Sequence, residues 1–359
     1  MNLPAPLTDF VRRPGTDATE PPEARGVPRD RVKLLVARPN AITHTWFANL
    51  GDHLRPGDML VVNNTATLPA AVYGRRDGRL IVVHFSTARD DHLWVVELRP
   101  STAATGHLGD IRPGERIDLP GGAAMVVGSS FPQPGVTGSR LWMSRLAIEG
   151  DVEAYLRRHG RPIRYAYVPL QWPLNTYQTV FARHPGSAEM PSAARPFSTE
   201  LVTSLIAAGV AIAPVTLHAG VSSAELHEPP APERYEVPPA TARMVNLTRA
   251  SGGRVIAVGT TVTRALETAA ADGLVHPAHG WTDLVVGPSR PVRVVDGLIT
   301  GWHDAGASHL LLLEAVAGAD LVADAYREAV ESGYLWHEFG DSALLLPDRG
   351  SGLRPVDCR

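Results

Sequence analysis

The hydrophobic period changes once along the chain, and this change constrains the fold most. Between about residues 71 and 148, short apolar runs with period two are separated by turns. From residue 151 onward, helix-length segments alternate with short apolar runs. The first pattern predicts a small β-barrel or sandwich, and the second predicts a mainly parallel sheet or an α/β barrel. We therefore expect an α/β domain over residues 1–70 and 150–359, with a β-barrel domain inserted over residues 71–149.

The expected elements can be placed from apolar runs and capping residues. Strands are predicted at 32–36, 59–62, 79–85, 92–98, 115–119, 123–127, 141–148, 210–217 and 254–258. Helices are predicted at 151–159, 198–208, 239–250, 262–271 and 320–332. Pro214 has no backbone N–H to donate, so its strand is expected to be bulged or at a sheet edge.

Composition narrows the class of protein. Of 359 residues, 44% are hydrophobic and 20% are charged, which excludes a disordered tail, a coiled coil and a collagen-like fibre. The net charge of −3 carries no general nucleic-acid signature, so RNA binding would need a local basic patch. Lys33 is the only lysine among 34 basic residues, a bias that codon usage explains as well as phosphate binding does.

Cysteine usage and hydropathy predict a cytoplasmic protein without a membrane span. The only cysteine, Cys358, excludes an intrachain disulfide and a thiolate metal cage. The most apolar stretch, 205–221, contains Pro214 and His218 and is shorter than the ~20 residues of a span. The first residues lack the basic and apolar regions of a signal peptide.

Three predicted strands end in polar residues. These endings are Asn63-Asn64-Thr65, Thr216-Leu217-His218 and Gly259-Thr260-Thr261. Functional residues of α/β folds collect at the carboxyl ends of strands, so the endings indicate a shared rim of an active site. The alternative is that Asn and Thr cap turns and helices here.

The Gly259-Thr260-Thr261 turn leads directly into a predicted helix. A helix N-terminus presents free N–H groups and partial positive charge, which suit a carboxylate or phosphate. Arg264, one turn further, is a candidate for a bidentate contact to the same group. The glycine spacing matches neither a Walker loop nor a dinucleotide fingerprint.

His218, His303 and Glu267 are the candidate acid–base residues. Imidazole titrates near neutral pH, although a single histidine is more often structural. Glu267 lies one turn beyond Arg264, so a pair between the two on the helix is the simpler interpretation. No cluster of histidine and acidic residues has metal-ligand spacing, so we expect no metal.

A basic patch is predicted next to the first helix of the α/β segment. Its arginines are Arg157, Arg158, Arg161 and Arg164. Positive charge at a helix C-terminus also complements the helix dipole, but this is the best local candidate for RNA phosphates.

Ordered motifs run along nearly the whole chain. They include 54–58 with Asn63-Asn64-Thr65, Tyr177-Gln178-Thr179, 185–188, 215–220, 256–261, Gly280-Trp281-Thr282-Asp283, 295–298 and 339–341. In this order they resemble the S-adenosylmethionine:tRNA ribosyltransferase-isomerase family of queuosine biosynthesis. The resemblance implies an α/β domain with a β-barrel insertion.

The resemblance also implies a reaction. S-adenosylmethionine donates its ribosyl group to 7-aminomethyl-7-deazaguanine in tRNA, adenine and methionine leave, and epoxyqueuosine forms. No cofactor or metal is implied, and the protein is expected to be a monomer. The implied substrate-binding residues are Asn63, Asn64, Thr65, Tyr177, Gln178, Thr179, Thr216, Gly259, Thr260, Thr261, Arg264, Trp281 and Asp283. His218 is the leading candidate for the base, with His303 and Glu267 as further candidates.

The chain departs from the family pattern at several positions. Pro196 replaces the histidine of Pro-Thr-Ala-Gly-Leu-His-Phe, and 161–165 replaces a proline-rich segment. A His-x-Met-His-x-Glu segment is missing before Glu233, and the residues after His303 also differ. Two alternatives therefore stay open: a diverged enzyme that cleaves S-adenosylmethionine with a small-molecule acceptor, and a non-catalytic nucleoside- or RNA-binding protein.

Overall fold

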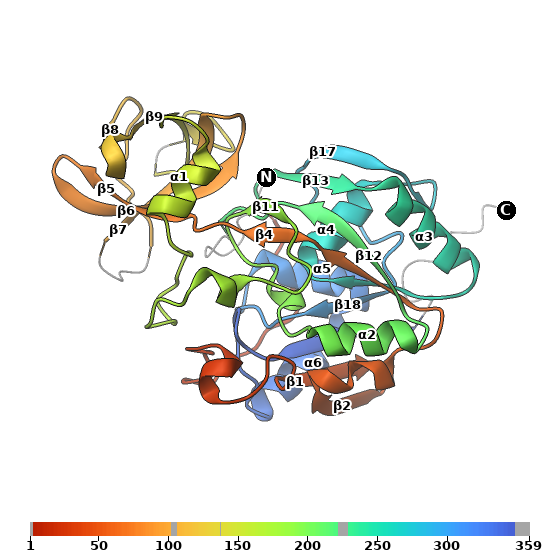
Figure 1. The fold of residues 1–359 in the computed structure, drawn as a ribbon. Helices are drawn as coiled ribbons and strands as arrows, with labels where there is room; N and C mark the ends of the chain where they lie inside the picture. The colour runs from red at the N-terminus through yellow and green to blue at the C-terminus, as the bar shows by residue number, and fades with distance from the viewer. Residues whose placement is uncertain (1–2, 102–105, 137, 222–228, 349–359) are drawn as a thin grey trace.

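A computed structural model describes residues 3–101, 106–136, 138–221 and 229–348. Cys358 lies outside these ranges. The described chain forms an open mixed sheet covered by helices, beside a separate closed barrel (Figure 1). The expected combination of an α/β fold and an inserted barrel is confirmed, and the sheet is open rather than barrel-like.

The large sheet has nine strands in the order β17-β13-β12-β3-β14-β18-β19-β1-β2. Their bounds are β1 (Lys33–Arg38), β2 (Ala41–Trp46), β3 (Met59–Asn63), β12 (Ala211–Leu217), β13 (Glu233–Val237), β14 (Val255–Val258), β17 (Ala278–Thr282), β18 (Gly297–Thr300) and β19 (Ser342–Leu345). The four strands from β12 to β18 are parallel, as expected, while β13, β17, β2 and the β18–β19 pair add antiparallel contacts.

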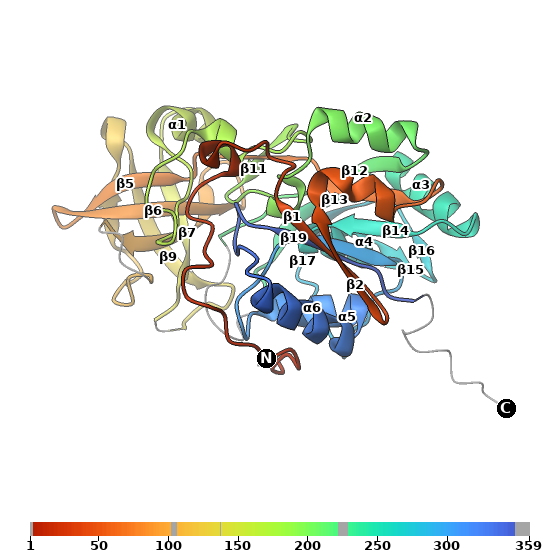
Figure 2. The ribbon, with the colours of Figure 1, turned by 90° about the horizontal axis from the view of Figure 1, so that it is seen from below.

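Both faces of the sheet are buried. Successive side chains along a strand point to opposite faces, so each strand contributes to the packing on both sides. Leu35, Met59 and Ala257 pack against one set of helices: α3 (Pro239–Ala250), α4 (Thr260–Thr268), α5 (Ser308–Ala317) and α6 (Ala319–Glu331). Leu60 and Val258 pack on the opposite face against α2 (Thr199–Ala207) and the 3-10 segment η2 (Phe47–His53). Figure 2 shows α2 on one side of the sheet and α5 and α6 on the other.

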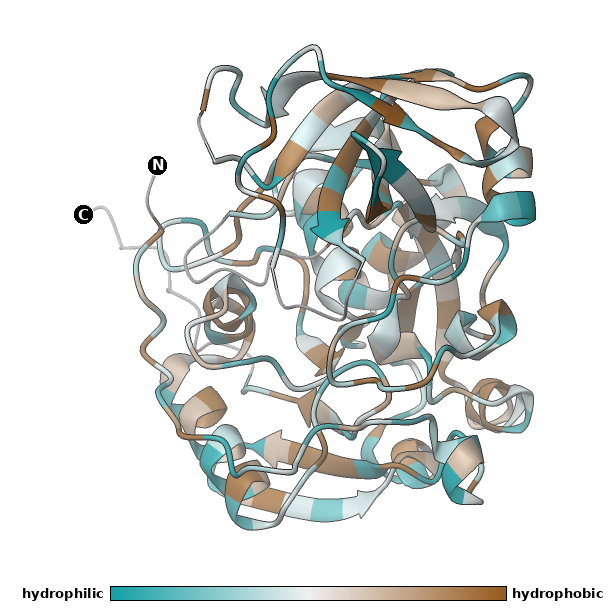
Figure 3. Cartoon of the chain, turned by 90° about the vertical axis from the view of Figure 1, so that its left-hand side faces the viewer, coloured by the Kyte–Doolittle hydropathy of each residue, from teal (hydrophilic) through white to brown (hydrophobic). Residues whose placement is uncertain are grey.

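The barrel closes in the order β10-β7-β6-β5-β8-β9. Its strands are β5 (Ala71–Arg76), β6 (Arg79–Ala88), β7 (Leu93–Pro100), β8 (Arg116–Asp118), β9 (Ala124–Phe131) and β10 (Leu141–Ala147). Apolar residues of alternating positions fill its interior, and the strands show apolar bands in Figure 3. These strands fall within the predicted 71–149 insertion; the domain boundaries themselves stay a prediction.

Capping residues explain why the predicted starts of two helices agree with the structure. The Asp151 carboxylate accepts the N–H of Ala154 at 2.7 Å and begins α1 (Val152–His159), and the Ser198 hydroxyl accepts the N–H of Leu201 at 3.1 Å at the start of α2. The prediction of a helix over 262–271 is wrong at both ends. Helix α4 starts at Thr260 and stops at Thr268, because a small hairpin of β15 (Ala270–Ala271) and β16 (Leu274–Val275) follows.

Two further features were not expected. Helix α5 has the apolar run Leu310–Leu313 buried on several sides, so it shows no amphipathic period. Pro214 lies in an interior strand rather than at an edge, but β13 pairs with β12 only beyond it, at Thr216 and Leu217. The Pro214 carbonyl instead accepts the Thr241 hydroxyl at 2.6 Å.

Short elements complete the chain. β4 (Thr65–Thr67) pairs in parallel with β11 (His184–Ser187), which brings the entrance of the barrel beside the segment that leaves it. The other 3-10 segments are η1 (Pro22–Arg25), η3 (Pro120–Gly122), η4 (Leu174–Tyr177) and η5 (Ser192–Ala194).

Candidate functional site

A cavity of about 370 Å³ lies where the barrel approaches the large sheet. Its walls include residues that follow three parallel strands: 219–221 after β12, 259–261 after β14 and 301–303 after β18. Further walls come from residues 162, 163, 165, 167, 188–193 and 337–338, and from Arg140 of the barrel side. A cavity of this size at strand ends suits a small-molecule substrate.

The predicted polar strand endings lie close together. Most of their side chains form hydrogen bonds between strands and do not line the cavity. The Asn63 amide donates to the Leu217 carbonyl at 2.8 Å and accepts the Leu217 N–H at 3.1 Å. The Asn64 side chain accepts the Thr216 hydroxyl at 2.8 Å. These contacts satisfy polar groups between the ends of β3 and β12. They fix the positions of the two strand ends without facing the cavity.

Eight of the thirteen predicted substrate-binding residues lie outside the cavity lining. They are Asn63, Asn64, Thr65, Gln178, Thr179, Thr216, Trp281 and Asp283. Gln178 bonds both backbone groups of Thr67, at 3.0 and 2.9 Å, which holds β4 in place. The Arg89 guanidinium lies 3.8 Å from the centre of the Trp281 ring.

Gly259, Thr260 and Thr261 do line the cavity, at the first turn of α4. Gly259 has a φ of 96°, a backbone conformation that favours glycine and turns the chain from β14 into the helix. The first N–H groups of a helix have no partner within it, so this turn presents donors and partial positive charge. The arrangement suits a carboxylate of a bound substrate.

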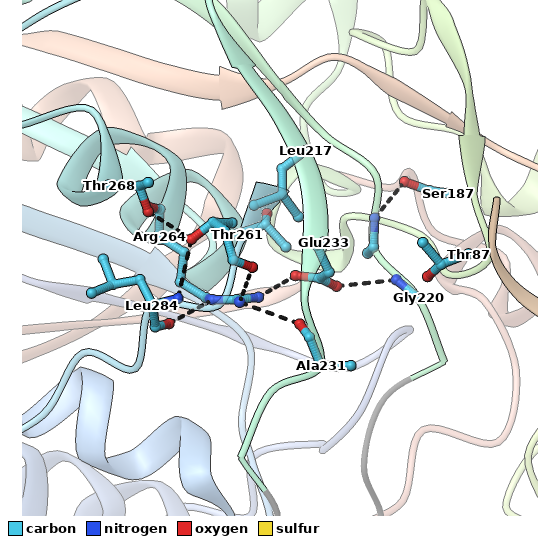
Figure 4. A network of polar contacts seen from close by, with 12 residues as sticks. Thr87, Ser187, Leu217, Gly220, Ala231, Glu233, Thr261, Arg264, Thr268 and Leu284 are labelled. Carbon is cyan, nitrogen blue, oxygen red and sulfur yellow. Dashed lines mark hydrogen bonds and ion pairs between the residues drawn. The ribbon is translucent and has the colours of Figure 1, made fainter. Parts of the chain in front are cut away.

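Arg264 lines the cavity, but its guanidinium is engaged in contacts with other protein groups of the cavity wall. It forms a buried ion pair with Glu233 and donates to the carbonyls of Leu284 at 3.0 Å and Thr282 at 3.2 Å (Figure 4). Glu233 in turn accepts the N–H of Gly220 at 3.0 Å. The network therefore ties α4 to the loops after β12 and β17.

His303 lines the cavity, together with a second histidine that the sequence analysis missed. The His303 ring stacks on His309 with centroids 4.4 Å apart, and its Nε2 lies 3.1 Å from the Thr300 hydroxyl. Burial lowers the pKa of His303 well below its usual value, and burial lowers the pKa of His309 to about 4. Both rings are therefore neutral near pH 7.

His218 and Glu267 are not among the cavity-lining residues. The His218 ring covers Gly186, where a Cβ would lie 2.4 Å from Nδ1, and burial lowers its pKa to about 4. The Glu267 carboxylate accepts the N–H groups of Arg293, Val294 and Val295 at 2.8–3.2 Å. The expected Arg264–Glu267 pair is absent, since Arg264 pairs with Glu233 and Glu267 holds a backbone segment.

Sequence reasoning also missed an ionisable wall of the cavity. Tyr165 donates to Glu189, Tyr167 donates to Glu338, and His337 stacks on Tyr167 with centroids 3.9 Å apart. These residues belong to no regular helix or strand, so hydrophobic period could not indicate them. Proximity to the 339–341 motif was the one available signal for Glu338.

The predicted basic patch divides into two parts. Arg157 and Arg158 are exposed on α1, where Arg157 also pairs with Glu153. The Arg161 guanidinium lies 3.4 Å from the centre of the Tyr73 ring, and Arg164 donates to the carbonyl of Val168 at 2.7 Å. The second pair of arginines is thus engaged in local structure.

The described ranges contain neither a candidate metal centre nor a helix that could span a membrane. No group of three or more His, Cys, Asp or Glu there is arranged to hold a metal ion. Likewise, none of the helices in those ranges has the length and apolar character needed to cross a membrane.

Comparison with known proteins gives consistent matches. The sequence model described as queuosine biosynthesis protein matches residues 9–345. S-adenosylmethionine:tRNA ribosyltransferase-isomerases from Moorella thermoacetica and Symbiobacterium thermophilum are each 38% identical, covering 94% and 89% of this chain and 98% and 94% of theirs. The crystal structure of S-adenosylmethionine tRNA ribosyltransferase from Thermotoga maritima matches with a TM-score of 0.53 and 28% identity, over 94% of this chain and 99% of the other.

Proposed function

The chain belongs to the queuosine biosynthesis protein family, and from this premise we propose how its residues carry out the family reaction. The protein is a transferase and isomerase that uses S-adenosylmethionine as its ribosyl donor. It modifies 7-aminomethyl-7-deazaguanine in tRNA, releases adenine and methionine, and forms epoxyqueuosine.

The cavity at the strand ends is the observation that supports a catalytic site here. Its volume of about 370 Å³ and its position between barrel and sheet suit a nucleoside substrate. The first turn of α4, with Gly259, Thr260 and Thr261, would hold the carboxylate of the methionine part of the donor. Arg264 and Glu233 would keep this wall rigid without contacting the donor.

His303 is the histidine best placed to act as the base. The sulfonium of the donor acidifies the C5′ protons of its ribose, so a neutral imidazole next to it can remove one of them. The resulting carbanion or ylide allows adenine to leave and the epoxide to close. His303 lines the cavity and is neutral, whereas His218 does not line it.

The tRNA would approach over the barrel side of the molecule. Arg157 and Arg158 on α1 are exposed next to this side, and their charge suits phosphate. We also propose a monomer in the cytoplasm, because one chain supplies both the barrel and the sheet around the cavity and because tRNA is the substrate.

The direct test is incubation with S-adenosylmethionine and tRNA that carries 7-aminomethyl-7-deazaguanine. We expect adenine and methionine to be released together, measured by chromatography, with no release when the same tRNA carries guanine at that position. Release with the free base and no tRNA would contradict tRNA as the acceptor and indicate a small-molecule enzyme. Binding of the donor without any release would contradict the catalytic proposal.

A further inference from the structure

One wall of the cavity contains a carboxylate that the reaction scheme above does not use. Glu338 lines the cavity and accepts a hydrogen bond from the Tyr167 hydroxyl. Among the described residues Glu338 has no ion-pair partner, since Arg195, the arginine that affects it electrostatically, pairs with Glu23 at 2.8 Å. A carboxyl group thus lies at the cavity without a cationic partner among the described residues.

A buried hydroxyl beside this carboxylate also lacks a partner. Tyr177 lines the cavity, is only 3% exposed, and its hydroxyl has no hydrogen-bond partner within the described ranges. The centroid of the Tyr177 ring lies 5.3 Å from that of Phe339, the residue that follows Glu338, and Tyr177 and Glu338 line the same cavity. Buried polar groups in native proteins are normally satisfied, so this hydroxyl points to a bound polar group.

The surroundings of Glu338 favour proton transfer near neutral pH. Burial, with a further contribution from Glu189, raises the pKa of Glu338 to about 7, while the Tyr167 hydrogen bond and Arg195 act in the opposite direction. Tyr165 and His337, whose rings both stack on Tyr167, are further titratable neighbours. A carboxylate of this kind is suited to accept a proton from an alkylammonium ion.

We propose that Glu338, held by Tyr167 and next to Tyr177, binds the primary ammonium of the aminomethyl acceptor and removes its proton. This inference rests on the proposed function, in which that amine is the nucleophile. The ammonium form carries no lone pair and cannot attack carbon. Deprotonation therefore has to come before transfer, and neither His303 nor the α4 turn is assigned to that step.

The step balances without any further reactant. One N–H bond of the ammonium breaks, and its proton moves to the Glu338 carboxylate. The free amine then attacks C5′ of the donor, an N–C5′ bond forms, and the C5′–S bond breaks with its electron pair on sulfur. Methionine leaves as a neutral thioether, and the new secondary amine carries the positive charge that the sulfonium has lost.

The other candidate ammonium is the α-amino group of the donor's methionine part. The position of Glu338 favours the acceptor. Its neighbours Tyr167, Tyr177 and Phe339 form a small cluster with residues 168 and 190, and none of residues 259–261 of the α4 turn belongs to this cluster. The two amines are separated by asking which substrate a charge-removing variant affects.

The experiment compares wild-type protein with Glu338→Gln, and uses Glu331→Gln on the exposed end of α6 as the matched control. Rates are measured from pH 5.5 to 9 with each substrate varied in turn. We expect Glu338→Gln to lower kcat/KM for the aminomethyl tRNA by about 100-fold at pH 7.5 and to leave the KM for S-adenosylmethionine within about twofold. The wild-type rate should fall below about pH 7, and Glu338→Gln should lack this acid limb.

Tyr167→Phe is the second variant, and it retains the carboxylate. Its loss of a hydrogen bond that lowers the Glu338 pKa should move the acid limb to higher pH, which a purely structural role would not do. An unchanged pH profile in both variants would overturn the proposal. A change confined to the KM for S-adenosylmethionine would also overturn it, and would assign Glu338 to the donor's amine.

A binding measurement separates this inference from the proposed function. The Kd is compared for tRNA with the aminomethyl base and for the same tRNA with guanine. Wild-type protein should prefer the amine-bearing tRNA by about tenfold, and Glu338→Gln should lose the preference. Should wild-type protein release no adenine yet keep the preference, the function fails while amine recognition by Glu338 stands. Equal affinity of the wild type for both tRNAs would overturn the inference.

Discussion

His303 and His218 have the same type of side chain, but the fold places the two rings in different surroundings. His303 lines the cavity beside His309, whereas His218 covers Gly186 behind the loop that lines it. Burial lowers the pKa of both rings, so protonation state does not separate them. Access to the cavity does, because a base must reach the proton it removes.

We therefore expect His303→Ala to lower kcat by about 100-fold or more, and His218→Ala to leave kcat within about threefold. The measurement is steady-state release of adenine, with the exposed His276→Ala as the matched control. Thermal unfolding would identify losses that arise from misfolding. Equal losses of kcat in well-folded His218→Ala and His303→Ala proteins would contradict the assignment.

Glu338 has a cost for stability that follows from its pKa. Its folded pKa of about 7 lies above the ordinary value of 4.5, so the folded state binds a proton in this range that the unfolded state has lost. The contribution of Glu338 to stability must therefore fall as pH rises from 4.5 to 7. We expect Glu338→Gln to raise Tm relative to wild type at pH 8 and to change it little at pH 4.5. A Tm that drops at pH 8 would count against this pKa.

At the scale of elements, the start of α4 joins three parts of the site. Its first turn lines the cavity, and Arg264 lies one turn further along the helix. Arg264 forms an ion pair with Glu233 of β13. The helix begins two residues earlier than predicted, because Gly259 turns the chain at positive φ directly after β14. The cavity wall therefore depends on an ion pair between a helix and a strand.

Removing one partner of this buried pair should be costly. Glu233→Gln leaves the Arg264 guanidinium buried without its counter-charge, and we expect a loss of about 3 kcal/mol in the free energy of unfolding. The KM for S-adenosylmethionine should rise, since the neutral amide is a weaker acceptor for the Gly220 N–H and no longer fixes Arg264 in the cavity wall. Urea unfolding measures the first effect. Asp324→Asn, which removes one partner of the exposed Arg327 pair, is the control and should cost under about 1 kcal/mol.

At the scale of the whole molecule, the cavity exists because a closed barrel stands against the open sheet. Arg140, directly before β10, lines the cavity from the barrel side and pairs with the fully buried Glu97 of β7 at 3.1 Å. Hydrogen bonding and nearby arginines lower the pKa of Glu97 to about 2, against the effect of burial. The net charge of −3 leaves tRNA affinity to local groups such as Arg157 and Arg158.

The double variant Arg157→Ala, Arg158→Ala should weaken tRNA binding by a similar factor for modified and unmodified tRNA. Phosphate contacts carry no base information, and each one lost lowers the salt dependence of log Kd by about 0.7–0.9. The measurement is tRNA affinity as a function of salt concentration. Arg327→Ala, on the far helix α6, is the control. An unchanged salt slope in the double variant would exclude this patch from the tRNA interface.

Local chemistry in the sequence determined the elements and their order. Asp151 and Ser198 cap their helices, and alternating apolar residues distinguish the barrel strands from the buried strands of the sheet. The ordered motifs likewise indicated the family and its reaction, and the comparisons confirm both. Such signals act between residues close in the chain, so they can be read without the fold.

Only the tertiary structure decided which polar residues face the cavity. Asn63 and Glu267 have the right chemistry for a site, but backbone groups from distant segments occupy them. Glu338 belongs to no periodic element, and the fold brings it to the hydroxyl of Tyr167 in a cavity that Tyr177 also lines. A side chain's role depends on the groups that satisfy its charge and hydrogen bonds, and long-range packing supplies those groups.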